Sequence, residues 1–269
     1  MTQLPIRIAV NYSDHLMKLM EQRPNLVVKV SDWDSTPKVE EVLRRFPKAE
    51  FLVHSTLAMA SGTTVDHSGR IWNELKALVP MTRTPYLSAH IAYNCEVDYS
   101  PEGKWIFGRR LTEDEQIENM RRNVGILRDA FGLEVALENQ TNCYGGAFVP
   151  HFVQGCTAPE FMIRALEATG CPMLLDLAHV RVNAAFLGMS VEEYLAPLPI
   201  ETVREIHLSG CRVVKDNLLS DEHVEMEEVD YDLLRRTLSC CHPYAVTLEY
   251  DKSCEHLEPQ IQRLEHLAK

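Results

Sequence analysis

The stretch TAPEFMIRALEATGCPMLLDLA, residues 157–178, joins a helix-like segment directly to a strand-like one. Its first part, 157–170, fits a helix, and PMLLDLA, 172–178, is almost continuously apolar. A continuous apolar run of this length indicates a strand that is buried on both faces, as in a parallel sheet. A helix packed beside such a strand is the unit of α/β folds, so the fold depends on how often this unit recurs.

Seven further runs have the same strand-like character. All eight are IRIAVNY (6–12), LVVKVSD (26–32), EFLVHST (50–56), PYLSAHIAY (85–93), EVALENQ (134–140), PMLLDLA (172–178), REIHLSG (204–210) and AVTLEYD (245–251). Strand and helix alternation predicts a parallel sheet, and a count of eight predicts closure into a (β/α)₈ TIM barrel of the α/β class. An open doubly wound sheet is the alternative, but it normally has a Gly-rich phosphate turn after its first strand, and none is present here.

Helical patterns lie between most of these runs. They cover 13–23, 36–46, 111–132, 157–170, 190–198, 230–240 and a C-terminal stretch from about Glu255. The first opens on Ser13, a favourable N-cap, and the third closes on Gly132, a common helix stop. No shift in composition marks a linker, so we expect one domain over residues 1–269.

The overall composition excludes several classes of protein. The chain has 269 residues, of which 45% are hydrophobic, and a formal net charge of -12. An acidic chain lacks the basic surface that grips nucleic acid, so we expect no nucleic-acid partner. No apolar run approaches the length of a membrane span, and MTQLPIRIAV does not resemble a secretory signal. The eight cysteines form no C-x-x-C pair, so we expect reduced thiols in a cytoplasmic protein.

Ionisable residues stand late in six of the apolar strand runs. They are His54, His90, Glu138, Asp176, His207 and Glu249. Three more follow closely: His179 in DLAH, and Asp221 and His223 in DEH, on the expected loop after the seventh strand. Because the carboxyl ends of barrel strands meet at one mouth, all nine should converge there.

A metal centre explains this set better than separate structural roles do. A lone buried histidine is usually a hydrogen-bonded core residue, and a lone buried carboxylate needs a cationic partner. Nine such groups on successive strand ends, with few lysines or arginines beside them, instead favour divalent cations. Imidazole and carboxylate together suit iron, zinc or manganese. We therefore predict a site for two or three metal ions.

The spacing suggests a division of the ligands. One ion would take His54, His90 and Glu138, and a second would take Glu138, Asp176, His207 and Glu249. The third would take His179, Asp221 and His223. Glu138 would bridge two ions, and with Asp176 it is the predicted catalytic pair.

Candidate substrate contacts lie next to these ligands. Asn139 is equally compatible with orienting Glu138, with binding substrate and with capping the strand end. Arg181 and Asn183 are candidates for contacts with an anionic substrate, such as a peptide carboxyl terminus. Lys29 could transfer a proton, but a solvated strand edge is the expected place for it.

Six segments, in order, resemble a known family. SAHIAY, ALENQTNCY, LLDLAHVRVNA, EIHLSG, DEH and LEYD, within roughly 50–251, are similar to the multinuclear non-heme iron-dependent oxidative enzymes, the DUF692 family that includes methanobactin biosynthesis protein B. The resemblance implies a xylose-isomerase-like TIM barrel with two or three Fe ions. It also implies oxygen-dependent modification of a cysteine or related residue in a ribosomally made peptide, often with a partner protein that presents the peptide.

The motifs carry the family's ligands onto eight positions of this chain: His54, His90, Glu138, Asp176, His207, Asp221, His223 and Glu249. His179 departs from the family, which has Asn at that point of a D-x-x-N motif. The family's E-x-H-x-E-N-Y-type segment after the second strand is replaced here by KVSDWDS.

Three other functions stay open. The nine positions also resemble the trinuclear zinc site of endonuclease IV, which implies a hydrolase or phosphodiesterase, although the G-E-G stretch of that family is missing. Sugar isomerases and epimerases share the inner carboxylates and histidine but do not need the outer three ligands. A metal carrier is the non-enzymatic alternative.

The remaining cysteines and histidines are expected to have structural roles or none. The expected packing residues are Cys95, Cys143, Cys211, Cys240 and Cys241. We expect His15, His67, His151, His242, His256 and His266 to be solvated.

Overall fold

All eight strand-like runs form strands of one closed parallel barrel in the computed structural model, which describes residues 5–32, 35–61, 69–99, 105–144, 147–148, 155–214 and 217–269. The barrel strands are β1 (Arg7–Asn11), β2 (Val27–Ser31), β3 (Phe51–Ser55), β4 (Tyr86–His90), β7 (Glu134–Glu138), β10 (Met173–Asp176), β11 (Val203–Leu208) and β14 (Ala245–Leu248). They lie in the order β1-β14-β11-β10-β7-β4-β3-β2 around the barrel. The predicted (β/α)₈ fold is therefore confirmed.

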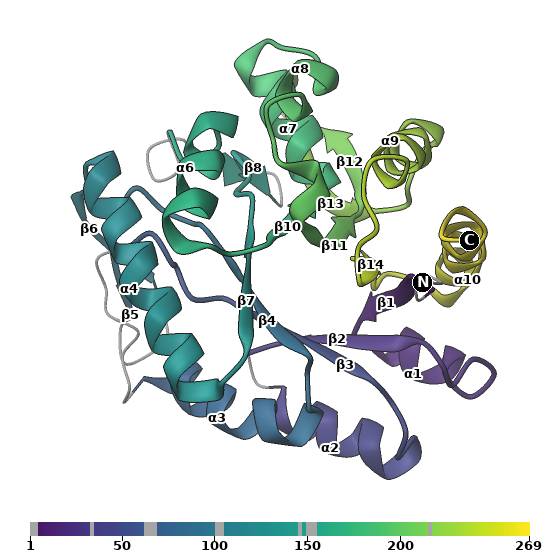
Figure 1. Cartoon of the computed structure of the whole chain (residues 1–269). Coiled ribbons are helices and arrows are strands. Elements are labelled where there is room, and N and C mark those ends of the chain that lie inside the picture. Colours follow the sequence, from purple (N-terminus) through teal and green to yellow (C-terminus); the bar gives the residue numbers. More distant parts are fainter. Residues whose placement is uncertain are drawn as a thin grey trace.

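Helices surround this barrel on its outside (Figure 1). They are α1 (Asp14–Leu19), α2 (Thr36–Arg45), α3 (Arg70–Thr82), α4 (Glu113–Phe131), α6 (Pro159–Thr169), α7 (Leu177–Leu187), α8 (Val191–Leu195), α9 (Glu228–Leu238) and α10 (Cys254–Leu267), with a short 3₁₀ turn, η1 (Ile200–Thr202). Ser13 caps α1 and Gly132 ends α4, as predicted. Neither α3 nor α7 was among the predicted helices. The strand predicted to run through residue 178 ends at Asp176, whose side chain caps α7 by accepting from the His179 backbone N–H.

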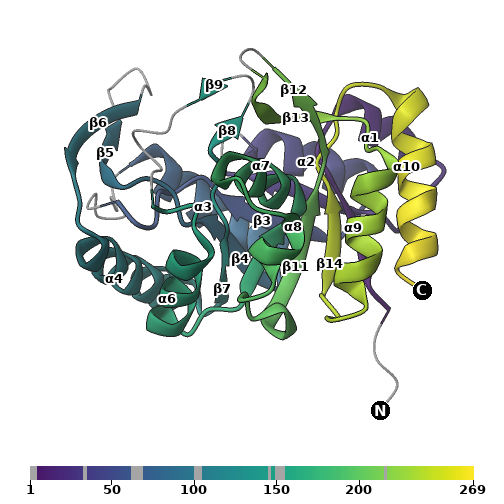
Figure 2. The same cartoon turned by 90° about the horizontal axis from the view of Figure 1, so that it is seen from above.

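Two small sheets are added at one end of the barrel, away from the C-terminal end of α10 (Figure 2). One is a hairpin of β5 (Cys95–Tyr99) and β6 (Trp105–Arg110). The other contains β12 (Gly210–Val213), β13 (Leu219–Val224), β8 (Cys143–Tyr144) and β9 (Ala147–Phe148). Each small sheet starts just after a barrel strand ends, so both lie at the carboxyl ends of the barrel strands, the end at which chemistry is expected.

Along the barrel strands, the inward-facing side chains change from apolar at one position to polar two residues later. One buried layer is a cluster of small and large apolar side chains from seven strands: Ala9, Val27, Leu52, Tyr86, Ala136, Leu174 and Ala245. Because side chains alternate in a strand, the residue two positions later points the same way. Those residues are Lys29 after Val27, His54 after Leu52, Glu138 after Ala136 and Asp176 after Leu174. The apolar layer therefore closes the barrel beneath a polar one.

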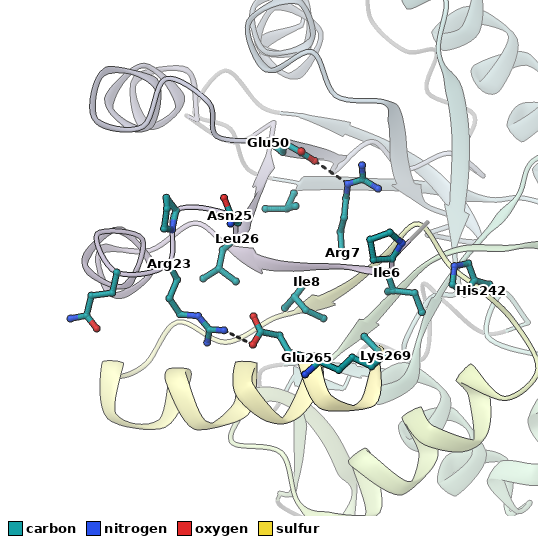
Figure 3. A pocket seen from close by; sticks show the side chains of 15 residues that line it. Ile6, Arg7, Ile8, Arg23, Asn25, Leu26, Glu50, His242, Glu265 and Lys269 are labelled. Atoms are coloured by element: carbon teal, nitrogen blue, oxygen red, sulfur yellow. Dashed lines mark hydrogen bonds and ion pairs between the residues drawn. The ribbon is translucent and has the colours of Figure 1, made fainter. Parts of the chain in front are cut away.

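The opposite end of the barrel has a pocket of its own. This cavity of about 930 Å³ is lined by residues that precede or begin strands, including Arg7, Leu26, Glu50 and His242. Ion pairs from Arg7 to Glu50 and from Arg23 to Glu265 cross its wall (Figure 3). The amino ends of barrel strands usually serve stability, so this cavity is separate from the predicted site.

Among the helices in the described ranges, none combines the length and the apolar character needed to cross a membrane.

Candidate metal centre

The polar layer brings the inner ligands together around one carboxylate. His54 Nε2 and His90 Nε2 each lie 3.3 Å from Glu138 Oε2. The other oxygen, Oε1, lies 3.3 Å from His207 Nδ1. Glu138 is 1% exposed, so these imidazoles are its surroundings in place of water. The two oxygens of Glu138 thus face different histidines, which is the geometry of a carboxylate between two neighbouring ions.

The outer ligands extend this cluster without a gap. Asp221 Oδ2 lies 3.5 Å from His179 Nε2 and 3.3 Å from His223 Nε2. His223 Nε2 also lies 3.2 Å from Glu249 Oε2, at the end of β14. All nine predicted ligands therefore lie at the same mouth of the barrel.

Asp221 and His223 belong to strand β13, so the prediction that they lie on a loop is wrong. β13 pairs with β12, and this hairpin holds both side chains over the barrel. His223 has a backbone φ of 46°, in the left-handed region that a non-glycine residue seldom adopts. Such local strain persists where the surrounding structure over-determines it and is concentrated at functional sites.

Among the described residues, three groups of side chains have ligand atoms close enough to share one ion. They are His54–His90–Glu138, Glu138–Asp176–His179 and Asp176–His207–Glu249, with the atoms of each group within 4.8 Å of one another. The first group is the one predicted. The third group lies wholly within the ligand set predicted for the second ion. Only Glu138–Asp176–His179 combines residues assigned to different ions, because His179 lies with Glu138 and Asp176 as well as beside Asp221.

Unsatisfied oxygens test whether metal ions fit here. Glu138 Oε2, Asp176 Oδ2 and Asp221 Oδ2 are buried and have no hydrogen-bond partner. A buried acceptor without a partner is unfavourable, and buried charges in proteins are normally paired or bound to metals. The three oxygens point into the cluster beside imidazole nitrogens. The residues therefore fit divalent ions that prefer mixed nitrogen and oxygen ligands.

In three of these histidines, the second ring nitrogen has a hydrogen-bonding partner behind the cluster. His54 Nδ1 lies 2.9 Å from Ser88 Oγ, and His179 Nδ1 lies 2.7 Å from the Asn139 carbonyl oxygen. His207 Nε2 lies 3.0 Å from Glu205 Oε1. Partners of this kind fix the ring orientation and leave the opposite nitrogen for a metal.

Glu205 was not among the predicted site residues. It is 1% exposed and also accepts hydrogen bonds from Tyr86 Oη and Thr247 Oγ1. The signal that could have found it is its spacing, since it lies two residues before His207 on the same face of β11.

Lys29 corrects a second expectation, that it lies on a solvated strand edge. It is 6% exposed and points into the polar layer, where it forms an ion pair with Glu249 and lies 3.5 Å from His207 Nδ1. The carbon stem follows β2, whose two faces are both buried, so an exposed position is not available to it.

The pKa values of the titratable groups in the cluster shift in different directions. Burial opposes the charged form of Glu138, but His90 and His207 outweigh it and hold the pKa of Glu138 well below its usual range. Burial raises the pKa of Asp176 to about 6. For His179 burial is likewise outweighed, here by Asp176 and Asp221, and its pKa is raised to about 10. Burial lowers the pKa of His54 well below its usual value.

The same carboxylates raise the pKa values of Lys29 and His207. Burial disfavours the Lys29 ammonium, but Glu249 and Glu138 outweigh it and raise the Lys29 pKa. Burial and Lys29 both disfavour protonation of His207, yet Glu249 and Glu205 raise its pKa to about 10. Excess negative charge in the metal-free cluster is therefore balanced by protons on imidazoles, which bound cations would replace.

The candidate substrate residues have structural partners. Asn139 bonds the backbone of Asp176, which favours an orienting role. The Asn183 amide donates to the Gln140 carbonyl oxygen at 2.7 Å and its oxygen accepts from the Asn142 backbone N–H. Arg181 forms an ion pair with Asp230 of α9. These contacts give no support to substrate binding by Arg181 or Asn183.

The remaining cysteines and histidines mostly follow expectation. Cys143 and Cys211 pack with Ala178 and Val182, and Cys95 is also buried. Cys240 is exposed and Cys241 is partly buried. His242, His256 and His266 are exposed, whereas His15 is half-buried with Nδ1 3.2 Å from Cys254 Sγ. His67 and His151 lie outside the described residues.

Comparison with known proteins identifies relatives over most of the sequence. A family model described as "RiPP precursor modification enzyme MbnB/TglH/ChrH" matches residues 13–269. A UPF0276 protein of Bordetella bronchiseptica is 27% identical over 161 residues, covering 58% of this chain and 54% of that protein. A UPF0276 protein of Caulobacter vibrioides is 22% identical over 227 residues, covering 84% and 77%. The chain thus spans about half of the length of the first of these relatives.

Solved structures show the same barrel at low sequence identity. A 3-keto-D-glucoside 4-epimerase from E. coli has a TM-score of 0.57 and 11% identity, covering 97% of this chain and 98% of that one. A D-psicose 3-epimerase from Clostridium cellulolyticum H10 has a TM-score of 0.52 and 8% identity, covering 98% and 96%. These similarities establish the TIM-barrel fold alone.

Proposed function

The chain belongs to the RiPP precursor modification enzyme family MbnB/TglH/ChrH, and from this membership we propose that it is an iron-dependent enzyme that uses oxygen to modify a peptide. The modified group would be a cysteine, or a related residue, of a ribosomally made peptide. The nine converging side chains would hold the iron ions. Family membership supports the peptide substrate. The choice of iron and oxygen follows the family resemblance, and the ligand set is compatible with it because imidazole and carboxylate together suit iron as well as zinc or manganese.

The position of Glu138 carries the proposal. Its Oε2 faces His54 and His90, and its Oε1 faces His207. A buried carboxylate that contacts histidines through both oxygens is suited to bridge two metal ions. Mixed imidazole and carboxylate ligands suit iron, and they leave positions open for a substrate.

Each part of the site has a distinct task in this mechanism. Iron bound there would supply Lewis acidity and redox chemistry with oxygen. The apolar layer that includes Leu52 and Tyr86 closes the barrel beneath the site and keeps water from entering from below. Glu205 and Ser88 orient the His207 and His54 rings. The peptide would approach from the open mouth, where β13 presents His223.

Replacing the carboxylate of Glu138, the proposed bridge between two ions, tests this function directly. We expect Glu138→Gln to lower the iron content and abolish oxygen uptake, because an amide cannot bridge two ions through two anionic oxygens. Oxygen consumption and peptide mass would be measured with the iron-loaded chain and a panel of cysteine-containing peptides. The matched control is Glu167→Gln, which changes an exposed carboxylate on α6.

Two results would decide against the proposal. Full iron content and activity in Glu138→Gln would remove the bridging role. Peptide modification that proceeds equally without oxygen would remove the oxidative chemistry. Serine in place of each peptide cysteine is the substrate control and should stop the modification.

Metal-assisted hydrolysis is the second candidate, and His179 is the observation that favours it. In D-x-x-H the Nε2 atom of His179 lies 3.5 Å from Asp221 Oδ2, an arrangement that suits a zinc ion. A cluster of this kind lowers the pKa of bound water toward neutrality. Turnover of a phosphodiester by the zinc-loaded chain without oxygen would support this candidate over oxidation.

A further inference from the structure

A lysine lies among the candidate metal ligands. The Lys29 ammonium forms an ion pair with Glu249 Oε1 and lies 3.5 Å from His207 Nδ1. Lys29 comes from β2, on the opposite side of β1 and β14 from His207 on β11, and its side chain crosses the barrel interior to reach them. Its side chain is 7% exposed, so water does not screen the ammonium from its neighbours.

The two atoms that contact Lys29 belong to one of the three candidate ligand groups. His207 Nδ1 and Glu249 Oε1 lie 3.5 Å from each other, and the Lys29 ammonium contacts both, so an ion bonded to these two atoms would occupy the position of the ammonium. An ammonium and a divalent ion at adjacent positions in a buried site repel each other strongly. The other two groups, which share Glu138, do not include the atoms that contact Lys29.

The charge balance of the buried site also favours two metal ions over three. Within the part of the chain that the structure describes, five buried carboxylates surround it: Glu138, Asp176, Glu205, Asp221 and Glu249. Histidines bind metals as neutral rings, so the five negative charges must be balanced by cations. Lys29 neutralises one of them, and the four that remain match two divalent ions. A third divalent ion would leave two positive charges in excess in a buried site.

We infer that Lys29 is a built-in cation that takes the place of a metal ion beside His207 and Glu249, so that this chain holds two ions, bridged by Glu138. The inference rests on the proposed metal function and narrows its two or three ions to two. Lys29 is a positioning residue here, because it keeps Glu249 turned toward the centre without binding metal.

Metal stoichiometry tests this inference. The full chain, stripped with a chelator, would be loaded with ferrous iron without oxygen, and the bound iron would be counted per chain. Wild type should hold two ions. Lys29→Met keeps the length of the side chain but removes its charge and should hold three. Lys252→Met removes a lysine at the mouth that donates to the Glu222 carbonyl oxygen, and it should still hold two.

Three ions in the wild type, or two in Lys29→Met, would overturn the inference. Lys29→Gln replaces the methionine variant if circular dichroism shows that the latter does not fold. An anomalous map of iron-loaded wild-type crystals gives the same answer without a variant. It should show two peaks beside Glu138, and a peak bonded to both His207 Nδ1 and Glu249 Oε1 would contradict the inference.

This test separates the inference from the proposed function. Two irons in the wild type and three in Lys29→Met, without oxidation of any peptide, would reject the oxidative function and keep the inference. Oxidation of a peptide by a wild type with three irons would do the reverse. A chain that binds no iron would reject both.

Discussion

Asn139 holds Asp176 by both of its backbone groups. The Asn139 side-chain amide donates to the Asp176 carbonyl oxygen at 3.0 Å, and the Asn139 side-chain oxygen accepts from the Asp176 backbone N–H at 2.8 Å. The side chain thus continues the β7–β10 ladder beyond Glu138, where the backbones no longer pair. The same residue's carbonyl oxygen faces His179 Nδ1, so one asparagine positions a carboxylate and a histidine of the centre.

Asn139→Ala should therefore destabilise the protein and weaken metal binding together. Two buried backbone groups lose their partners, and at about 1–3 kcal/mol for each group this costs about 2–6 kcal/mol in all. Urea denaturation of the metal-free protein measures the first effect, and competition with a chelator measures the second. Gln140→Ala is the control, because Gln140 Oε1 has no hydrogen-bond partner. Equal stability of the two variants would contradict the role of Asn139.

Glu205→Gln should lower metal affinity while the fold is kept. The neutral amide no longer holds the His207 ring in place beside Glu138 Oε1, and losses of such outer contacts typically weaken metal binding by about 10–100-fold. Chelator competition measures this change. Glu134→Gln, an exposed carboxylate that pairs with Arg204 at the start of β7, should leave the affinity unchanged. An unchanged affinity in Glu205→Gln would show that His207 does not depend on it.

Gly210→Ala should displace the hairpin that carries Asp221 and His223. A Cβ atom at residue 210 would lie 2.2 Å from the Glu225 carbonyl oxygen, so the backbone must move. Overpacking of this kind costs about 1–3 kcal/mol. Gly125→Ala, inside α4 with nothing within 4 Å of the added atom, should instead stabilise by about 0.5–1 kcal/mol. Urea midpoints compare the two, and a destabilised Gly125→Ala or a neutral Gly210→Ala would contradict this account.

The metal-free protein should lose stability as the pH rises from about 6.5 toward 10. The pKa of His179 and that of His207 are raised from 6.5 to about 10, since nearby carboxylates outweigh burial. Over this range the folded chain keeps protons that the unfolded chain has released. Each group therefore lowers the free energy of unfolding by up to about 1.4 kcal/mol per pH unit. The stability that they contribute is complete below pH 6.5 and lost as the pH passes their folded values.

Bound metal should remove this pH dependence, because it holds the same imidazoles without their protons. Thermal unfolding at a series of pH values, with a chelator and with excess ferrous iron without oxygen, measures both forms. A metal-free protein whose melting temperature is constant from pH 6.5 to 9 would show that His179 and His207 are not protonated in the fold.

The barrel and its inner ligands could be predicted because burial leaves a strong signal in sequence. Parallel strands covered on both faces are nearly all apolar, so His54 and Glu138 stand out within them. Convergence then follows from the fold, because the carboxyl ends of barrel strands meet.

Other features could not be predicted because they depend on tertiary contacts. β13 carries the polar run DEH and reads as a loop, and only its pairing with β12 makes it a strand. Lys29 reads as a solvated residue because lysine is seldom buried without a partner. Its partners, Glu249 and His207, are 220 and 178 residues away in the chain and come together only in the closed barrel.

The metal content of the protein tests the central claim most directly. The chain would be purified without added metal from iron-replete cells, and each element would be counted per chain. The account predicts two irons held by the cluster around Glu138, with iron lost in Glu138→Gln. Zinc with negligible iron would contradict the oxidative function and favour hydrolysis, and a chain free of any bound metal would contradict the claim that these side chains form a metal centre.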